Sequence, residues 1–203
     1  MSIEFIVTTL VVVISPGVGA LYTISAGLSR GVKASLVAAF GCTLGIVPHM
    51  LAAITGLAAI LHTSALAFEI IKYLGVAYHL RMAWSTLRET GALSVETDRA
   101  PKTALKVIVE SILINILNPK LSIFFFAFLP QFVPADTDGA LGQMLGLSGV
   151  FMLATFVVFA LYGLFAAAMR AHVISRPAIM TWMRRTFAAA FVLLGVRLAL
   201  TER

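Results

Sequence analysis

The stretch Asn115-Ile116-Leu117-Asn118-Pro119-Lys120 interrupts a long apolar segment. Val107–Ile114 precedes it and Leu121–Leu129 follows it, and both runs are apolar. In a helix that starts near Lys106, Lys120 lies about 20 Å along the axis, close to the centre of a bilayer. There a lysine costs about 2.5–3.5 kcal/mol and a mid-helix proline about 3 kcal/mol. Two such costs at adjacent positions predict a functional site.

The composition is that of a helical membrane protein. Of the 203 residues, 60% are hydrophobic and 12% are charged, about half the charged fraction of a soluble domain. The mean hydropathy is +1.00 and the pI is about 9.9. The basic residues lie in short loops between apolar runs, which indicates membrane topology and not nucleic-acid binding. The single cysteine, Cys42, excludes a disulfide framework, and we expect the first apolar segment to be a retained helix.

Six apolar segments predict an all-α, polytopic membrane protein with six transmembrane helices. A polar linker, residues 88–104, divides the single transmembrane domain, residues 1–203, into two halves, residues 1–87 and 105–203. The segments are about Phe5–Leu28, Ala34–Leu61, Ile70–Leu87, Leu105–Phe132, Leu141–Met169 and Thr186–Thr201.

Three loops that fall on the same side of the membrane carry ten Lys and Arg residues. They are the Arg30/Lys33 loop, the linker counted through to Lys106 (Arg88–Lys106) and a loop expected at Arg170–Arg185. Short basic loops remain in the cytoplasm. The sequence therefore predicts a cytoplasmic linker and two periplasmic termini.

Three crossings in each half predict inverted repeats, because an odd number forces the halves to insert in opposite senses. The first helix of each half is expected to be broken at a proline, Pro16 in Ser15-Pro16-Gly17 and Pro119 in the second half. The third segments share Leu74-Gly75-Val76 and Leu194-Gly195-Val196.

A broken span frees backbone groups that lipid cannot satisfy, so it is tolerated inside protein or against a water-filled cavity. The N-terminus of a half-helix suits a carboxylate, and the freed carbonyls of the preceding one suit an ammonium group. Two opposed breaks therefore predict a zwitterion site. Its candidate residues are Ser15, Pro16, Gly17, Asn115, Asn118, Pro119 and Lys120. The alternative is that each proline only kinks its helix.

Several motifs resemble the LysE/RhtB family of amino-acid exporters over nearly the whole chain. They are Ser15-Pro16-Gly17, Gly27-Leu28-Ser29-Arg30-Gly31, Gly41 and Gly45 with His49, Lys72…Gly75-Val76-Ala77-Tyr78, Asn115…Asn118-Pro119-Lys120 and Leu129-Pro130-Gln131-Phe132. The resemblance implies a bacterial inner-membrane permease that exports amino acids or their derivatives, driven by the proton gradient and without a cofactor. This chain departs from the family pattern at Val18, where a second proline is frequent, and at Tyr78-His79-Leu80. Pro48-His49 without a nearby acid favours a neutral substrate of the threonine, homoserine or leucine type.

Each polar candidate also has a plainer role. Lys120 fits substrate binding or proton coupling, but also snorkelling or pairing with carbonyls at a helix C-terminus. Asn115 and Asn118 fit hydrogen bonds to substrate or between helices. His49 and Glu110 are further proton-coupling candidates, although a lone histidine on an apolar helix is also a common packing partner.

Small residues spaced four apart predict close helix approach. The pairs are Gly27/Gly31, Gly41/Gly45 and Gly142/Gly146. Such faces allow a homodimer without requiring one.

The competing function is a cation or metal-ion transporter of the wider LysE superfamily. Hard cations need several oxygen ligands and soft ones need thiolates. Glu110 is the one acid near membrane depth and Cys42 the one thiol, so we expect no metal site. A membrane-embedded enzyme is disfavoured as well, because no spacing suggests a nucleophile, a base and an orienting acid. The roles of His79 and Arg81 stay open.

Overall fold

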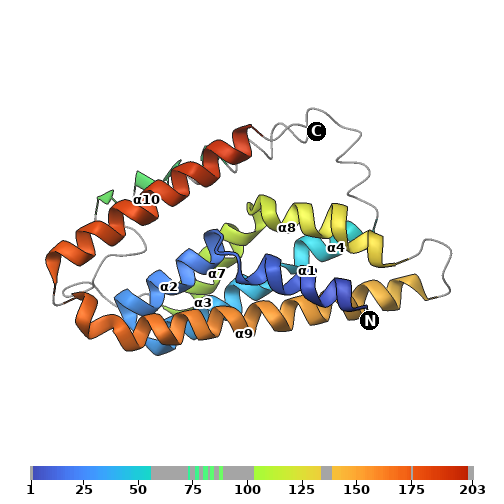
Figure 1. Cartoon of the computed structure of the whole chain (residues 1–203), viewed down its shortest axis with the longest axis horizontal. Coiled ribbons are helices and arrows are strands. Elements are labelled where there is room, and N and C mark those ends of the chain that lie inside the picture. Colours follow the sequence, from blue (N-terminus) through green and yellow to red (C-terminus); the bar gives the residue numbers. More distant parts are fainter. Residues whose placement is uncertain are drawn as a thin grey trace.

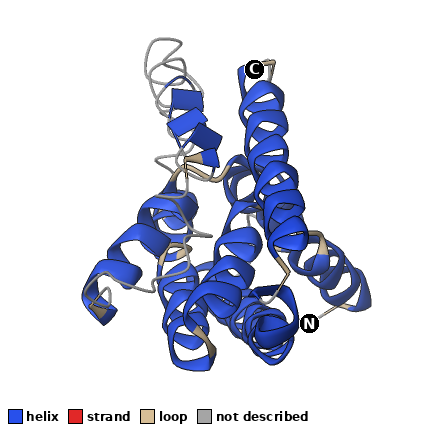
Figure 2. Ribbon diagram, turned by 90° about the vertical axis from the view of Figure 1, so that its left-hand side faces the viewer, coloured by secondary structure: helices blue, strands red, loops and turns tan. Residues whose placement is uncertain are grey.

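The computed structural model describes residues 2–55, 73, 76–77, 80–81, 83–84, 87–88, 103–133, 139–174 and 176–200. Throughout these ranges the chain forms helices and connecting loops and no β-strand (Figure 2). Most of the expected third segment, the linker and His79 lie outside the described residues, whereas Arg81 is described and exposed.

The first span is broken at the predicted place. Helix α1, Ile3–Ile14, begins at Ser2, whose hydroxyl accepts a hydrogen bond from the Phe5 amide. Ser15 is extended, with ψ of 115°, as expected for a residue before proline. Helix α2, Val18–Arg30, then continues at an angle of 51° to α1. The predicted break is confirmed.

The second segment contains a further interruption. Gly31, with φ of +83°, turns the chain from α2 into α3, a conformation that glycine adopts without strain. Helix α3, Val32–Leu44, is followed by α4, Val47–Ile54, and the two together form a candidate span of 23 residues. The sequence analysis did not single out the junction between them.

The fourth segment is also broken as predicted. Helix α7, Ala104–Ile116, is capped by Thr103, and α8, Pro119–Ile123, starts with the proline in its first turn, where the missing N–H costs nothing. A π-helical turn, Phe124–Phe128, and a 3-10 turn, Leu129–Phe132, complete the segment. The two arms, 104–116 and 120–132, make an angle of 62°.

The last two helices are longer than the sequence suggested. Helix α9, Ala140–Ile174, has 35 residues and is about 52 Å long, more than the roughly 30 Å of the hydrocarbon layer. Helix α10 is Pro177–Ala199. The bounds predicted for the loop, Arg170–Arg185, are therefore wrong. Arg170 lies within α9 and Arg185 within α10, and the connection falls between Ile174 and Pro177.

Helix α9 runs along α2 and α3, and α3 packs on α7, so the two broken spans lie in one bundle (Figure 1). An aromatic cluster joins α1, the π-helical turn and α9. In it, Phe124 stacks on Phe151 with ring centroids 4.1 Å apart, and Phe5 and Phe125 are fully buried. Along its outer face α9 exposes Leu153, Leu161 and Phe165. A helix that is apolar on every side suits lipid contact.

Two described helices are long and apolar enough to cross a membrane, Val32–Ile54 and Ala140–Val173, and each bent pair adds one further candidate span. The protein is therefore a helical membrane protein. Six crossings and inverted repeats stay predictions.

The glycine pairs divide into two groups. A Cβ at Gly27, Gly41 or Gly45 would lie within 2.5–2.7 Å of an atom of α9 or α7, which confirms close helix approach. Gly31, Gly142 and Gly146 face open space within the described residues. For them the prediction of a close contact inside this chain is wrong.

Candidate functional site

The two breaks meet at the side chain of Lys120. Its Nζ donates hydrogen bonds to the carbonyl oxygens of Val12, at 2.9 Å, and Ser15, at 2.7 Å. Helix α1 ends at Ile14, so its last carbonyls lack partners within the helix. The lysine thus makes the pairing with a helix C-terminus that was its plainer alternative role, and it links residues more than 100 positions apart in the chain. Its role in substrate binding or proton coupling stays a prediction.

A residue that the sequence analysis missed completes this contact. Tyr162, on α9, donates its hydroxyl to the Ile14 carbonyl at 2.7 Å. In the sequence it stands in an ordinary apolar run, and no local signal marks it. The end of α1 therefore receives donors from two other elements, α8 and α9.

The start of α2 lies beside the same ammonium. Gly17 is buried, and a Cβ there would lie 3.2 Å from Lys120 Nζ, so glycine leaves room for the lysine. Gly17 is the residue that precedes α2, and no side chain there accepts a hydrogen bond from the first N–H groups of the helix. Pro16 has no backbone N–H. The N–H groups in the first turn of α2 therefore point toward the break with the positive end of the helix dipole.

The second break is satisfied mainly by its own side chains. Asn118 Oδ1 accepts from the Lys120 amide at 3.1 Å, and Asn118 Nδ2 donates to Asn115 Oδ1 at 3.2 Å. Asn115 Nδ2 donates in turn to the Cys42 carbonyl at 2.6 Å. Both asparagines are buried. They connect α7, α8 and α3, which is the helix-to-helix role that the sequence left open.

His49 joins this network from α4. Its Nε2 lies 2.9 Å from the Asn115 carbonyl, and its Nδ1 lies 3.4 Å from the Ser122 hydroxyl. Because the carbonyl can only accept, Nε2 is assigned as the protonated nitrogen. His49 is therefore a bonded partner of the second break.

Glu110 lies elsewhere in the bundle. Tyr22, on α2, donates its hydroxyl to Glu110 Oε2 at 2.7 Å, and Glu110 lies on α7, on the other side of the bend from Lys120 on α8. The structure thus brings Ser15, Gly17, Asn115, Asn118 and Lys120 together, with Pro16 and Pro119 in the connecting backbone. It does not bring Glu110 to them.

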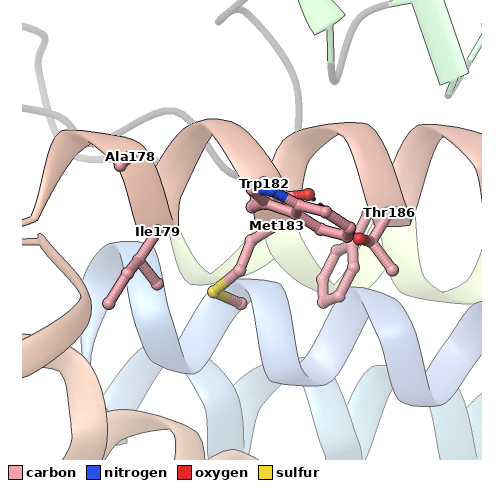
Figure 3. A pocket seen from close by; sticks show the side chains of 6 residues that line it. Ala178, Ile179, Trp182, Met183 and Thr186 are labelled. Carbon is pink, nitrogen blue, oxygen red and sulfur yellow. Dashed lines mark hydrogen bonds between the residues drawn. The ribbon is translucent and has the colours of Figure 1, made fainter.

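An apolar cavity of about 310 Å³ lies along α10 and is lined by Ala178, Ile179, Trp182, Met183, Thr186 and Phe187 (Figure 3). It includes none of the predicted site residues, and its lining carries little that would bind a charge. Among the residues that the structure describes, no group of three His, Cys, Asp or Glu side chains is placed to hold a metal ion.

Comparison of the sequence with known proteins identifies the family of this chain. The model of the LysE type translocator matches residues 10–202. The chain is similar to an uncharacterized membrane protein of Vibrio cholerae, with 32% identity over 97% of this chain and 95% of the relative. It is also similar to a homoserine/homoserine lactone efflux protein of Salmonella typhimurium, with 28% identity over 96% and 94% of the two chains. A leucine efflux protein of an Enterobacter strain is 28% identical over 75% and 73%.

No solved structure matches the chain. The family match covers both breaks, and the resemblance inferred from the motifs is confirmed. This chain belongs to the LysE type translocator family.

Proposed function

We propose that this protein is a secondary transporter that exports amino acids or amino-acid derivatives across the bacterial inner membrane. The observation that carries the proposal is the contact of Lys120 with the carbonyls of Val12 and Ser15, which joins two bent spans. A purely structural protein has no need to place an amine and two helix breaks together inside a bundle. Relatives named for homoserine and leucine efflux support a neutral substrate.

In the proposed site the two charged groups of the substrate bind to opposite ends of the first break. The carboxylate binds the first turn of α2 beyond Ser15, Pro16 and Gly17, next to the Lys120 ammonium. The substrate ammonium binds the carbonyls at the end of α1. Asn115 and Asn118 hold Lys120 in place through the Asn118 cap, and Pro119 starts the helix that carries it.

The proposed topology has six crossings in two inverted repeats, residues 1–87 and 105–203, joined by a cytoplasmic linker, residues 88–104. Arg170 supports it, because its guanidinium donates to the Leu28 and Ser29 carbonyls at 3.1 Å each. This brings the basic end of α9 to the basic turn at Arg30 (left in Figure 1). Basic residues gathered at one end favour the cytoplasmic side there and periplasmic termini at the other.

Proton antiport is the proposed coupling, with His49, Glu110 and Lys120 as candidate groups. His49 is one hydrogen bond from the second break. Glu110 lies nearer the basic end, where a proton carried inward would leave to the cytoplasm. Each holds a hydrogen bond that a change of protonation would alter.

Counterflow in proteoliposomes tests the proposal. We expect labelled homoserine, threonine or leucine to accumulate, and a pH gradient to increase the rate. Liposomes that contain Lys120→Met protein serve as the matched control. Uptake of metal ions with no response to any amino acid would replace this function with the cation-transport alternative.

A further inference from the structure

We infer that the carbonyls at the end of α1 form a binding site for a primary ammonium group, which Lys120 fills when no substrate is bound. The substrate ammonium would displace it. The site itself is inferred from geometry, whereas its use during export rests on the proposed function.

The contacts around Lys120 Nζ are those of a bound ammonium ion. The N···O distances are 2.9 Å to Val12 and 2.7 Å to Ser15, as in charge-assisted hydrogen bonds. A primary ammonium has three N–H donors, and these two carbonyls accept two of them. The negative end of the α1 dipole lies at the same place. Tyr162 occupies the Ile14 carbonyl and thereby fixes which carbonyls remain for a cation.

The lysine is tethered so that its side chain can leave while its backbone stays. The Lys120 amide is held by Asn118 Oδ1 in the first turn of α8. Only the flexible four-carbon stem reaches the carbonyls. Nothing in the Asn115–Asn118 network depends on where Nζ lies.

A substrate carboxylate favours the exchange, because it attracts the Lys120 ammonium away from the carbonyls of α1. Nζ lies beside Gly17, where the free N–H groups of α2 attract an anion. A carboxylate bound there competes with the carbonyls for the lysine ammonium. In an amino acid the carboxylate and the ammonium are attached to the same carbon atom. The substrate ammonium is therefore positioned to take the carbonyls that Lys120 leaves.

This exchange provides selectivity for molecules that carry both groups. A free amine cannot expel Lys120, because it offers no anion to receive the lysine. A free carboxylic acid can draw Lys120 away, but it leaves the carbonyls of α1 without a donor. A carbonyl left without a donor at membrane depth is unfavourable, because lipid cannot replace the lost bond, so the acid binds weakly.

Ligand-dependent melting of purified protein in detergent tests the site without any transport. The variant Lys120→Ala removes the atoms that propylammonium would replace. We expect propylammonium chloride to raise its melting temperature by several degrees in a saturable manner. Tetramethylammonium chloride, which has no N–H donor, is expected to have no effect at equal ionic strength. Wild-type protein and Lys106→Ala, which loses an exposed lysine of α7, are expected to respond to neither salt.

Three results would overturn the inference: equal effects of the two salts, an equal response in wild-type protein, or no response in a folded Lys120→Ala protein. If the alanine variant cannot be purified folded, Lys120→Ser is used with the same expectations, because serine is also short. If the wild-type protein exports amino acids but propylammonium does not raise the melting temperature of Lys120→Ala, the ammonium site alone is refuted. If propylammonium raises that melting temperature but the wild-type protein exports no amino acid, the proposed function alone is refuted.

Discussion

The two helix breaks satisfy their freed backbone groups in opposite ways. At the second break two side chains of the break itself supply much of the bonding, because Asn118 caps α8 and bonds Asn115. His49 of α4 and the Cys42 carbonyl of α3 add bonds from neighbouring helices. At the first break the carbonyls of α1 depend on donors from distant segments, Lys120 and Tyr162. No side chain caps the start of α2.

This difference assigns different roles to the two breaks. A network of buried, mutually bonded amides is rigid, so we propose that the second break acts as the frame of the site. Contacts made by a long, flexible lysine are easier to exchange, so we propose that a ligand enters at the first break. Four substitutions test this division.

Replacing Lys120 should have the largest effect, because it removes the one cation that joins the breaks. We expect Lys120→Met to lower the rate of efflux by about 10- to 100-fold, the equivalent of a lost charged hydrogen bond. Membrane insertion and expression should be unchanged, since methionine is apolar. Counterflow rate per mole of inserted protein measures this.

The matched control is Lys106→Met, which changes an exposed lysine at the start of the same segment. It should export at the wild-type rate. If Lys120→Met exports normally, the first break is not where substrate binds.

Asn115→Ala should damage the frame. The substitution leaves the Cys42 carbonyl and Asn118 Nδ2 without their partner, which costs about 2–3 kcal/mol of stability. The melting temperature in detergent should fall by several degrees. Ser111→Ala is the control, one turn earlier on α7, because the Ser111 hydroxyl donates within its own helix to the Val107 carbonyl, and its loss should lower the melting temperature less than Asn115→Ala does. Equal melting temperatures for the two variants would show that the Asn115 network carries no stability.

Gly45→Ala tests how tightly the frame is packed. The new Cβ would lie 2.7 Å from Asn115 Cβ and 3.1 Å from the Ile112 carbonyl, so α3 must move away from α7. Overpacking of this kind costs about 1–3 kcal/mol. Gly149→Ala on α9 meets nothing within 4 Å and should be neutral or stabilise the helix by up to about 1 kcal/mol. The melting temperatures of the two variants test this. A Gly45→Ala protein as stable as the wild type would mean that α3 and α7 can move apart at no cost.

The sequence alone predicts the parts of this molecule that carry a large local cost. Pro16 and Pro119 interrupt apolar runs, and Lys120 is a charge among phenylalanines, so both breaks and the lysine stand out. Pro177 was also a usable signal for the start of α10, since proline is favoured at the first position of a helix. The hydropathy pattern instead predicts a start near Thr186, nine residues after the observed start of α10 at Pro177.

Contacts between distant segments leave no such signal. Tyr162 differs little from its apolar neighbours in the sequence, yet it binds a carbonyl 148 positions away. The spacing of Gly142 and Gly146 equals that of Gly41 and Gly45, but only the second pair meets another helix. Which glycine faces a neighbour depends on helix rotation in the bundle, and small residues at regular spacing do not specify that rotation.

Tyr162→Phe should have the smallest effect, and it separates the two donors at the first break. The variant keeps the ring and removes only the hydroxyl that binds Ile14. A single neutral hydrogen bond in a membrane protein contributes about 0.6 kcal/mol, so we expect about a threefold change in efflux rate. The Tyr162 hydroxyl occupies the Ile14 carbonyl, so its loss adds a third carbonyl that a substrate ammonium can reach. The ammonium can then bind in more than one position, and discrimination between substrates of different size should weaken. An efflux rate as low as that of Lys120→Met would instead make the tyrosine an equal partner of the lysine.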